Sequence, residues 1–320
     1  GFAVFLLAAA FCLFWAGRLV AAGADERQDY LILNDEYSQI LEAAPEEGIG
    51  QSFDWPAGSP LYGLRLDVAY CLPASYLKRL RAFTQTLKPG FVLVGEVLGG
   101  DYNLWMGPEL CHSVTNYECY KGLWSSLNDR NLFEIGHSLA RQYGPEPWTL
   151  YKGAHLLSFV DNHDVTRIAS KLRDPAPLPL IYALLFGMPG TPALYYGSEW
   201  GISGEKAPCS DAGLRPALEK PEWNALTSWI ARLAAARRGS PALREGSYRN
   251  VLLTNLQLIF ERRTETERVL VAVNADSQPY TAHFDAGCGL AWDLISGQQH
   301  DFGGGSQLPP YSAFFWKIER

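Results

Sequence analysis

A run of alternating residues, Gly63-Leu-Arg-Leu-Asp-Val-Ala69, is predicted to form a β-strand. Successive side chains of a strand point to opposite faces, so Arg65 and Asp67 share one face while the two leucines take the other. Opposite charges on one strand face cost free energy to bury unless they pair or take part in chemistry. The pattern therefore indicates either a structural ion pair or a catalytic pair.

Outward from this strand, short apolar runs alternate with segments of helical period, which is typical of βα units with a parallel sheet. Further strands are predicted at 91–97, 113–118, 156–161 and 191–196. Helices are predicted at 75–87, 131–142 and 178–186. The last of these helices is ended by Met188-Pro189-Gly190. The middle of the chain is therefore expected to be α/β, with five parallel strands.

A helix from Trp223 to Arg238 is followed at Gly239-Ser240-Pro241 by a change to short strands and turns. Strands are predicted at 251–262, 268–274, 280–284, 291–294 and 312–318, which suits a small antiparallel sandwich. The predicted organisation is an atypical segment at 1–62, a partial (β/α) barrel at 63–239 and an all-β domain at 240–320.

Composition and charge exclude several classes of protein. The 320 residues are 48% apolar and 19% charged, which is globular rather than disordered. A net charge of −7, with no basic run, disfavours a nucleic-acid partner. The six cysteines form no C-x-x-C pair, so neither a zinc site nor a disulfide framework is indicated, and a reducing compartment such as the cytoplasm fits best.

The first seventeen residues carry no charge and are rich in Ala, Leu and Phe. Their length is at the lower limit for a membrane span, so a membrane anchor or an export signal is one interpretation. A buried helix, or a segment foreign to the fold behind it, is the other. A membrane partner is expected only under the first interpretation.

Two more acids stand where predicted strands end. Glu96 closes an apolar run, and Asp164 closes Phe159-Val-Asp-Asn-His-Asp164. Either acid alone could be a helix N-cap or a turn residue. In a (β/α)₈ barrel, however, catalytic groups come from the carboxyl ends of different strands and meet on one face. Glycoside hydrolysis needs such a set, with one acid protonated and another ionised.

The three acidic segments, in this order, resemble the short conserved regions of the α-amylase family, glycoside hydrolase family 13. The resemblance extends through Gly190-Thr-Pro-Ala-Leu-Tyr-Tyr-Gly-Ser-Glu199 and the closing β domain, so it covers roughly residues 62–320. It implies a (β/α)₈ TIM barrel followed by an antiparallel β-sandwich. It also implies a retaining glycosidase that hydrolyses α-glucans or maltodextrins through an aspartyl glycosyl-enzyme.

The resemblance carries over a role to each matching residue. Asp67 is implied as nucleophile, Glu96 as general acid/base and Asp164 as the acid that stabilises the transition state. The implied substrate-binding residues are Arg65, which would hold Asp67 ionised, His163, which would bond a sugar hydroxyl, and Arg167, for which a structural role is the alternative. The implied partner is an α-linked oligosaccharide or polysaccharide.

The sequence departs from the α-amylase pattern just after the nucleophile. Many α-amylases have Lys-His three and four positions after it, where this chain has Tyr70-Cys71. The departure favours a cyclomaltodextrinase or neopullulanase type of member. Aromatic residues could stack on sugar rings, although most aromatic side chains serve packing. Those considered are Tyr70, Tyr102, Trp105 and Trp200.

A complete barrel takes about 250 residues, or about 31 for each βα unit. The 176 residues from Leu64 to Gly239 therefore hold between five and six units, and the family's early Asn-His region is not found. The chain is expected to be truncated at its N-terminus and to hold about strands four to eight. The edge of the 63–69 strand would then lie open. The family often binds calcium through the missing parts, so no cofactor is assigned.

Two alternatives to a hydrolase stay open. A transglycosylase would use the same residues but pass the sugar to an acceptor other than water. An inactive barrel fragment would keep the signature residues with residual sugar binding only.

Overall fold

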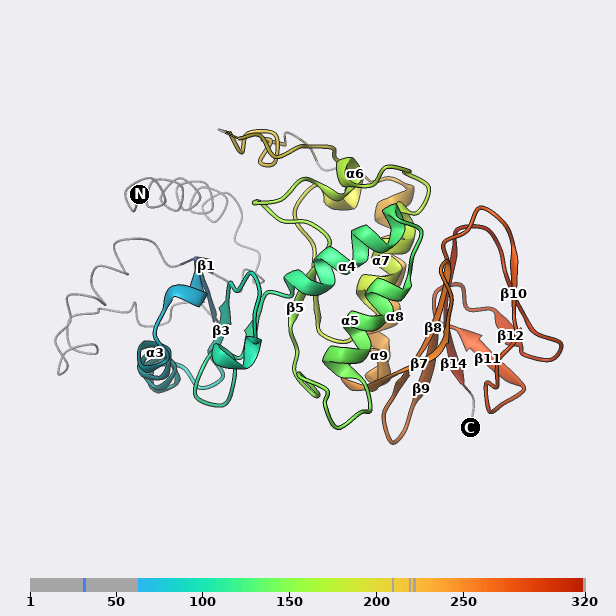
Figure 1. Ribbon diagram of the computed structural model, residues 1–320, viewed down its shortest axis with the longest axis horizontal. Helices are drawn as coiled ribbons and strands as arrows, with labels where there is room; N and C mark the ends of the chain where they lie inside the picture. The colour runs from blue at the N-terminus through green and yellow to red at the C-terminus, as the bar shows by residue number, and fades with distance from the viewer. Residues whose placement is uncertain (1–30, 33–62, 209, 219, 221–222, 319–320) are drawn as a thin grey trace. The chain divides into compact units, whose positions relative to one another are not determined.

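The computed structural model describes residues 31–32, 63–208, 210–218, 220 and 223–318 (Figure 1). Its contacts divide the chain into two compact units, one that ends at Thr115 and one that begins at Asn116. The division differs from the boundaries predicted from composition, which stay a prediction. The apolar segment 1–17 lies outside the described residues. Within the described ranges, no helix is long and apolar enough to cross a membrane.

The first unit is built on a four-stranded parallel sheet in the order β1-β2-β3-β4. Its strands are β1 (Leu31–Ile32), β2 (Gly63–Leu66), β3 (Val92–Gly95) and β4 (Ser113–Val114). Helix α3 (Ala74–Leu87) connects β2 to β3 and buries Leu77 and Leu80, three positions apart on one helix face. This βα unit confirms the strands and the helix predicted between residues 63 and 97, although both strands are shorter than expected.

The edge of β2 is paired, contrary to the expectation that it would lie open. Leu31 and Ile32 pair in parallel with Leu64 and Arg65. Backbone groups of β2 therefore have a neighbouring strand on both sides at these positions, since β3 pairs with the other side. The short length of β1 limits the protection to these two residue pairs.

The prediction of a strand through residue 118 was wrong beyond Val114. Asn116 caps a helix instead, because its side-chain oxygen accepts a hydrogen bond from the Cys119 N–H at 3.1 Å. Helix α4 (Tyr117–Asn128) begins directly after it. The threonine and tyrosine on either side of Asn116 favour strands by propensity, and the cap overrides that preference.

The second unit combines helices with a short parallel pair of strands, β5 (Leu157–Phe159) and β6 (Thr191–Ala193). Its helices are α4, α5 (Phe133–Tyr143), α6 (Ile168–Lys171), α7 (Leu178–Gly187), α8 (Ala225–Gly239) and α9 (Pro241–Glu245). Helix α7 is apolar on all sides, and eight of its ten residues are buried. It contacts α4 and α8 as well as the antiparallel sheet that follows. The predicted helices at 131–142 and 178–186 are confirmed.

A six-stranded antiparallel sheet, in the order β12-β11-β14-β9-β8-β7, stands beside these helices in the second unit (Figure 1). A two-stranded sheet, β10-β13, pairs antiparallel and packs on it through a core that includes Leu270, Leu308 and Trp316. The strands are β7 (Ser247–Leu253), β8 (Gln257–Arg263), β9 (Arg268–Asn274), β10 (Tyr280–Ala282), β11 (Leu290–Asp293), β12 (Gln299–Asp301), β13 (Ser306–Leu308) and β14 (Ser312–Ile318). The predicted antiparallel β region is confirmed.

The single strand predicted at 251–262 was wrong, because this segment is a hairpin. Its turn contains neither glycine nor proline and is held by Thr254, whose Oγ1 accepts the Gln257 N–H at 2.9 Å. Strands β12 and β13, of three residues each, were not predicted.

Candidate active site

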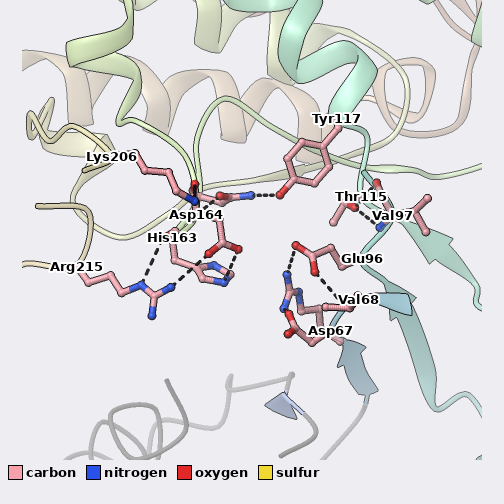
Figure 2. Close-up of polar contacts among 12 residues, drawn as sticks. Asp67, Val68, Glu96, Val97, Thr115, Tyr117, His163, Asp164, Lys206 and Arg215 are labelled. Atoms are coloured by element: carbon pink, nitrogen blue, oxygen red, sulfur yellow. Dashed lines mark hydrogen bonds and ion pairs between the residues drawn. The ribbon is translucent and has the colours of Figure 1, made fainter. Parts of the chain in front are cut away.

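In the first unit, a cluster of three charged residues lies where β2 and β3 end (Figure 2). Arg65 on β2 forms an ion pair with Asp67, two residues further along the chain. The same guanidinium lies 2.9 Å, through Nη2, from Glu96 Oε1, one residue beyond β3. The Glu96 side chain is 7% exposed and that of Asp67 is 36% exposed. The guanidinium of Arg65 therefore pairs with a buried carboxylate, that of Glu96, and with an accessible one, that of Asp67.

The backbone at Val68 supplies a hydrogen bond to the second carboxylate oxygen of Glu96. Val68 has φ 49° and ψ 37°, a left-handed conformation that is costly for a β-branched residue. This turn directs the Val68 N–H at Glu96 Oε2, at 3.0 Å, and the Glu96 N–H donates to the Leu66 carbonyl at 2.8 Å. Both carboxylate oxygens of Glu96 are thus fixed by groups from β2 and the turn after it.

The segment that carries Glu96 is held from its other side as well. Thr115 Oγ1 accepts the Val97 N–H at 2.8 Å and donates to the Val97 carbonyl at 3.0 Å. At Gly95 an added Cβ would lie 3.0 Å from Cβ of Ala69 and 3.2 Å from Sγ of Cys111. A glycine before Glu96 therefore lets the turn after β2 approach β3 closely.

Tyr70 stands beside the two carboxylates. Burial raises the pKa of its phenol, and the neighbouring Cys71, Glu96 and Asp67 raise that pKa further. The phenol is therefore neutral near pH 7 and keeps its proton as a hydrogen-bond donor. The side chain is 38% exposed, so a ligand in contact with Asp67 has access to it.

In the second unit, His163 and Asp164 follow β5 (Figure 2). His163 Nε2 lies 3.0 Å from Asp164 Oδ2, and Arg215 Nη2 lies 3.3 Å from Asp164 Oδ1. The backbone is fixed by Asn162, whose Oδ1 accepts the Asp164 N–H at 2.8 Å and whose Nδ2 donates to the Tyr117 hydroxyl at 3.0 Å. Asp164 therefore presents a partly exposed carboxylate between an imidazole and a guanidinium.

Asp161 has a structural role in the same segment. It is 2% exposed, and its oxygens accept hydrogen bonds from the Ile168 N–H at 2.8 Å and from Ser198 Oγ at 2.7 Å and 2.9 Å. Burial raises the pKa of this carboxyl, while those hydrogen bonds and Arg167 oppose the rise. The first N–H of α6 is thus bound by Asp161 and not by Asp164, while Arg167 occupies the N-cap position without a side-chain cap.

The surroundings of Arg167 favour its structural role over the predicted substrate contact. This residue is fully buried, and its guanidinium donates to the carbonyl oxygens of Tyr196 and Leu214. A sugar cannot reach it without displacing those contacts. The geometry therefore supports a structural role for Arg167, in which its guanidinium donates hydrogen bonds to backbone carbonyl oxygens.

Two basic residues near Asp164 were not predicted from the sequence. Arg215 also donates through Nε to the His163 carbonyl at 3.3 Å, and Lys206 Nζ donates to the Asp164 carbonyl at 2.8 Å. Both lie in the stretch 202–224, which has no periodic pattern. The one local signal is Asp211, four residues before Arg215 and 3.3 Å from it.

Within the described ranges, no group of three or more His, Cys, Asp or Glu side chains is arranged to hold a metal ion.

Comparisons with known proteins agree on one family. Residues 70–250 match the model for the alpha amylase catalytic domain. The chain is 26% identical over 253 residues to a maltogenic alpha-amylase of Bacillus acidopullulyticus, an alignment that covers 72% of this chain and 40% of that protein. It is 32% identical over 223 residues to a cyclomaltodextrin glucanotransferase of Bacillus sp. strain 1011, covering 66% of this chain and 30% of that one.

The fold matches solved structures of the same kind. The α-amylase of Geobacillus thermoleovorans, solved in complex with acarbose, superposes with a TM-score of 0.72 at 20% identity. The match covers 81% of this chain and 60% of that one. The chain thus spans about 40% of the length of the maltogenic relative and less of the glucanotransferase.

Proposed function

Because this chain belongs to the alpha-amylase family, whose matching domain takes up more than half of it, we propose that it acts on α-linked glucans as a retaining glycosidase. In this proposal β2 to β6 correspond to strands four to eight of the family's (β/α)₈ barrel. The order of the strands and the acids at the ends of three of them support that correspondence.

The observation that carries the proposal is the single guanidinium of Arg65 in contact with both Asp67 and Glu96. Sharing one guanidinium keeps two carboxyl groups close together. Retaining glycosidases hold theirs about 5–5.5 Å apart, whereas inverting enzymes leave about 6.5–9.5 Å for a water molecule. The shared cation therefore favours the retaining mechanism.

The proposed reaction has two steps. The carboxylate of Asp67 attacks the anomeric carbon while Glu96, which must be protonated for this step, gives that proton to the departing glycosidic oxygen, and a glycosyl ester is left on Asp67. Glu96 then takes a proton from water, and the oxygen of that water displaces Asp67 from the anomeric carbon. Arg65 would keep Asp67 ionised for the first step.

Asp164 and His163 are proposed to act on the sugar ring. A carboxylate favours the positive charge that develops on the anomeric carbon, and an imidazole can bond a sugar hydroxyl more tightly in the transition state. The partial exposure of both side chains, 33% and 23%, supports direct contact with a ligand. Arg167 is not proposed as a substrate ligand, since it is buried.

The test is hydrolysis of maltodextrin by the protein and by Asp67→Asn and Glu96→Gln. Both variants should lose nearly all activity, and retained hydrolysis by either one would reject the assigned roles. The matched control is Glu109→Gln, which removes another ion-paired carboxylate from the same unit at an exposed site. The first sugar released should be the α-anomer by NMR, because two displacements restore the starting configuration.

Transglycosylation is the second candidate function, and the similarity to a cyclomaltodextrin glucanotransferase favours it. It differs only in the second step, in which a sugar hydroxyl replaces water. Adding maltose or glucose as acceptor should then yield longer or branched products at the expense of hydrolysis. An inactive fragment would give neither product in the assay of residues 1–320.

A further inference from the structure

We propose that Arg167 is a positioning residue that acts through Leu214 to keep Arg215 on Asp164. The proposal rests on the function proposed above, in which Asp164 stabilises the transition state. It gives the buried Arg167 a part in catalysis without contact with the substrate.

The first step is the contact between Arg167 and Leu214. The carbonyl oxygen of Leu214 accepts hydrogen bonds from Nε and Nη2 of Arg167, at 3.1 Å and 2.7 Å. Two donors of one planar group on one acceptor fix both the position and the direction of that carbonyl. The backbone next to Arg215 is therefore tied to a side chain that is fully buried.

The second step is that Arg167 itself is anchored. Its Nη1 donates to the Tyr196 carbonyl at 2.6 Å and to Ser198 Oγ at 3.1 Å, and Ser198 in turn donates to Asp161. The guanidinium also lies 4.1 Å from the centre of the Tyr195 ring. These contacts attach Leu214 to the end of β5 and to the segment after β6.

The third step is what the anchor does for Arg215. Arg215 Nη2 lies 3.3 Å from Asp164 Oδ1 and also 3.3 Å from Asp211 Oδ2. Nη2 carries two N–H donors and is shared by the two carboxylates, and Asp211 belongs to the same local turn. If the Leu214 carbonyl were released, Arg215 could follow Asp211 away from Asp164. The anchor therefore keeps a cation on the carboxylate that is proposed to face the sugar.

A double-mutant cycle tests whether Arg167 acts through Arg215. Arg167→Met should lower kcat for maltodextrin roughly 10- to 100-fold, because displacement of a catalytic group by about 1 Å has an effect of this size. KM should change much less, since the lost interaction is made in the transition state. In an Arg215→Met background the same substitution should lower kcat less than about 3-fold further. If the kcat losses of the two single variants multiplied in the double variant, or if Arg167→Met lost no kcat, the proposal would be overturned.

Stability is controlled with two other variants. Arg262→Met removes another buried guanidinium that places two donors on one carbonyl, that of Gly246, at 3.3 Å and 2.9 Å, without touching Arg167 or its partners, and should leave kcat unchanged. Arg167→Lys keeps the charge but cannot place two donors on Leu214, so it should fold and still lose kcat. Full activity in Arg167→Lys would contradict a positioning role for the guanidinium.

Limited proteolysis does not depend on enzyme activity, so it tests this proposal independently of the proposed function. Lys206 lies in a loop with Gly204, where an added Cβ would clash with the Gly213 carbonyl oxygen, so this loop packs against the segment just before Leu214. The Arg167 backbone N–H on the Gly204 carbonyl, at 2.9 Å, is kept in Arg167→Met, so loosening of the loop reports the loss of the side-chain contact with Leu214. Trypsin should cut after Lys206 several-fold faster in Arg167→Met than in Arg262→Met. An unchanged rate would contradict the anchor. Absence of maltodextrin hydrolysis in the unmodified protein would contradict the proposed function instead.

Discussion

Arg65 Nη2 lies 2.9 Å from Glu96 Oε1 while the same guanidinium pairs with Asp67. A single cation therefore balances two carboxylates that reach it from neighbouring parallel strands. Removing it would leave like charges close together in a partly buried site, which disfavours the ionised form of at least one of them. Arg65 is thus expected to matter both for the stability of the first unit and for the chemistry.

Substituting Arg65 tests this relationship. Arg65→Met should lower kcat/KM for maltodextrin at least about 100-fold, because the charge that orients both carboxylates is lost. Arg65→Lys should retain only a small part of the kcat/KM that Arg65→Met loses. An ammonium group is a point charge and cannot orient two carboxylates as a planar guanidinium does. Steady-state kinetics at several pH values measure both effects. Near-normal activity in Arg65→Lys would show that charge alone suffices.

At the Val68 turn we expect glycine to be more stabilising than alanine, which is the reverse of the usual order. Val68 has φ 49°, where a side chain with a Cβ atom is strained and glycine is not. Val68→Gly should therefore have a free energy of unfolding about 1 kcal/mol higher than Val68→Ala. At an ordinary position the alanine variant would be the more stable one. Urea unfolding of the two variants decides the order, and a more stable alanine variant would contradict the strain.

The sequence predicted the acids at the strand ends because a polar residue after an apolar run is a local signal. It also predicted α3, α5, α7 and α8, each of which has ten or more residues. Helix α4 was missed because its start depends on the Asn116 cap, whereas the flanking residues favour a strand. Local pattern is therefore sufficient for long elements and fails where one side-chain hydrogen bond decides.

Residues that act through tertiary contacts could not be predicted in this way. Arg167 looked like a ligand of the substrate because it follows the Asp164 motif, but only the structure shows that Leu214 and Tyr196 surround it. Arg215 lies 51 residues from Asp164, and no spacing rule relates the two. Their association depends on how the loops after β5 and β6 pack together.

His112 makes the first unit sensitive to acid. Its Nδ1 accepts the Leu93 N–H at 2.9 Å and contacts Arg81, and burial and the charge of Arg81 lower the pKa of this imidazole to about 4. In the unfolded chain the pKa is near its ordinary value of 6.5. Between these values the unfolded state binds more protons, so stability falls as the pH is lowered through this window, by at most about 1.4 kcal/mol per pH unit.

His112→Asn isolates this effect, because the amide oxygen can accept the same N–H without titrating. The difference in unfolding free energy between the natural protein and the variant should change between pH 7 and pH 4.5 and level off below about pH 4. Chemical denaturation at a series of pH values gives this difference, in which the titration of other carboxylates cancels. A difference that does not depend on pH would mean that His112 is not the titrating group.

Two glycines that end helices, Gly187 of α7 and Gly239 of α8, should respond to alanine in opposite ways. At Gly187 an added Cβ would lie 2.8 Å from Val271 Cγ1, where the helix packs on β9, whereas Gly239 has no atom within 4 Å. Gly187→Ala should lower the free energy of unfolding by about 1–3 kcal/mol, because a well-packed contact cannot absorb a methyl group. Gly239→Ala should be neutral or stabilising by up to about 1 kcal/mol, through helix propensity alone. Adding Val271→Ala to Gly187→Ala should restore part of the loss, and equal effects at both glycines would show that the contact of α7 with the sheet is loose.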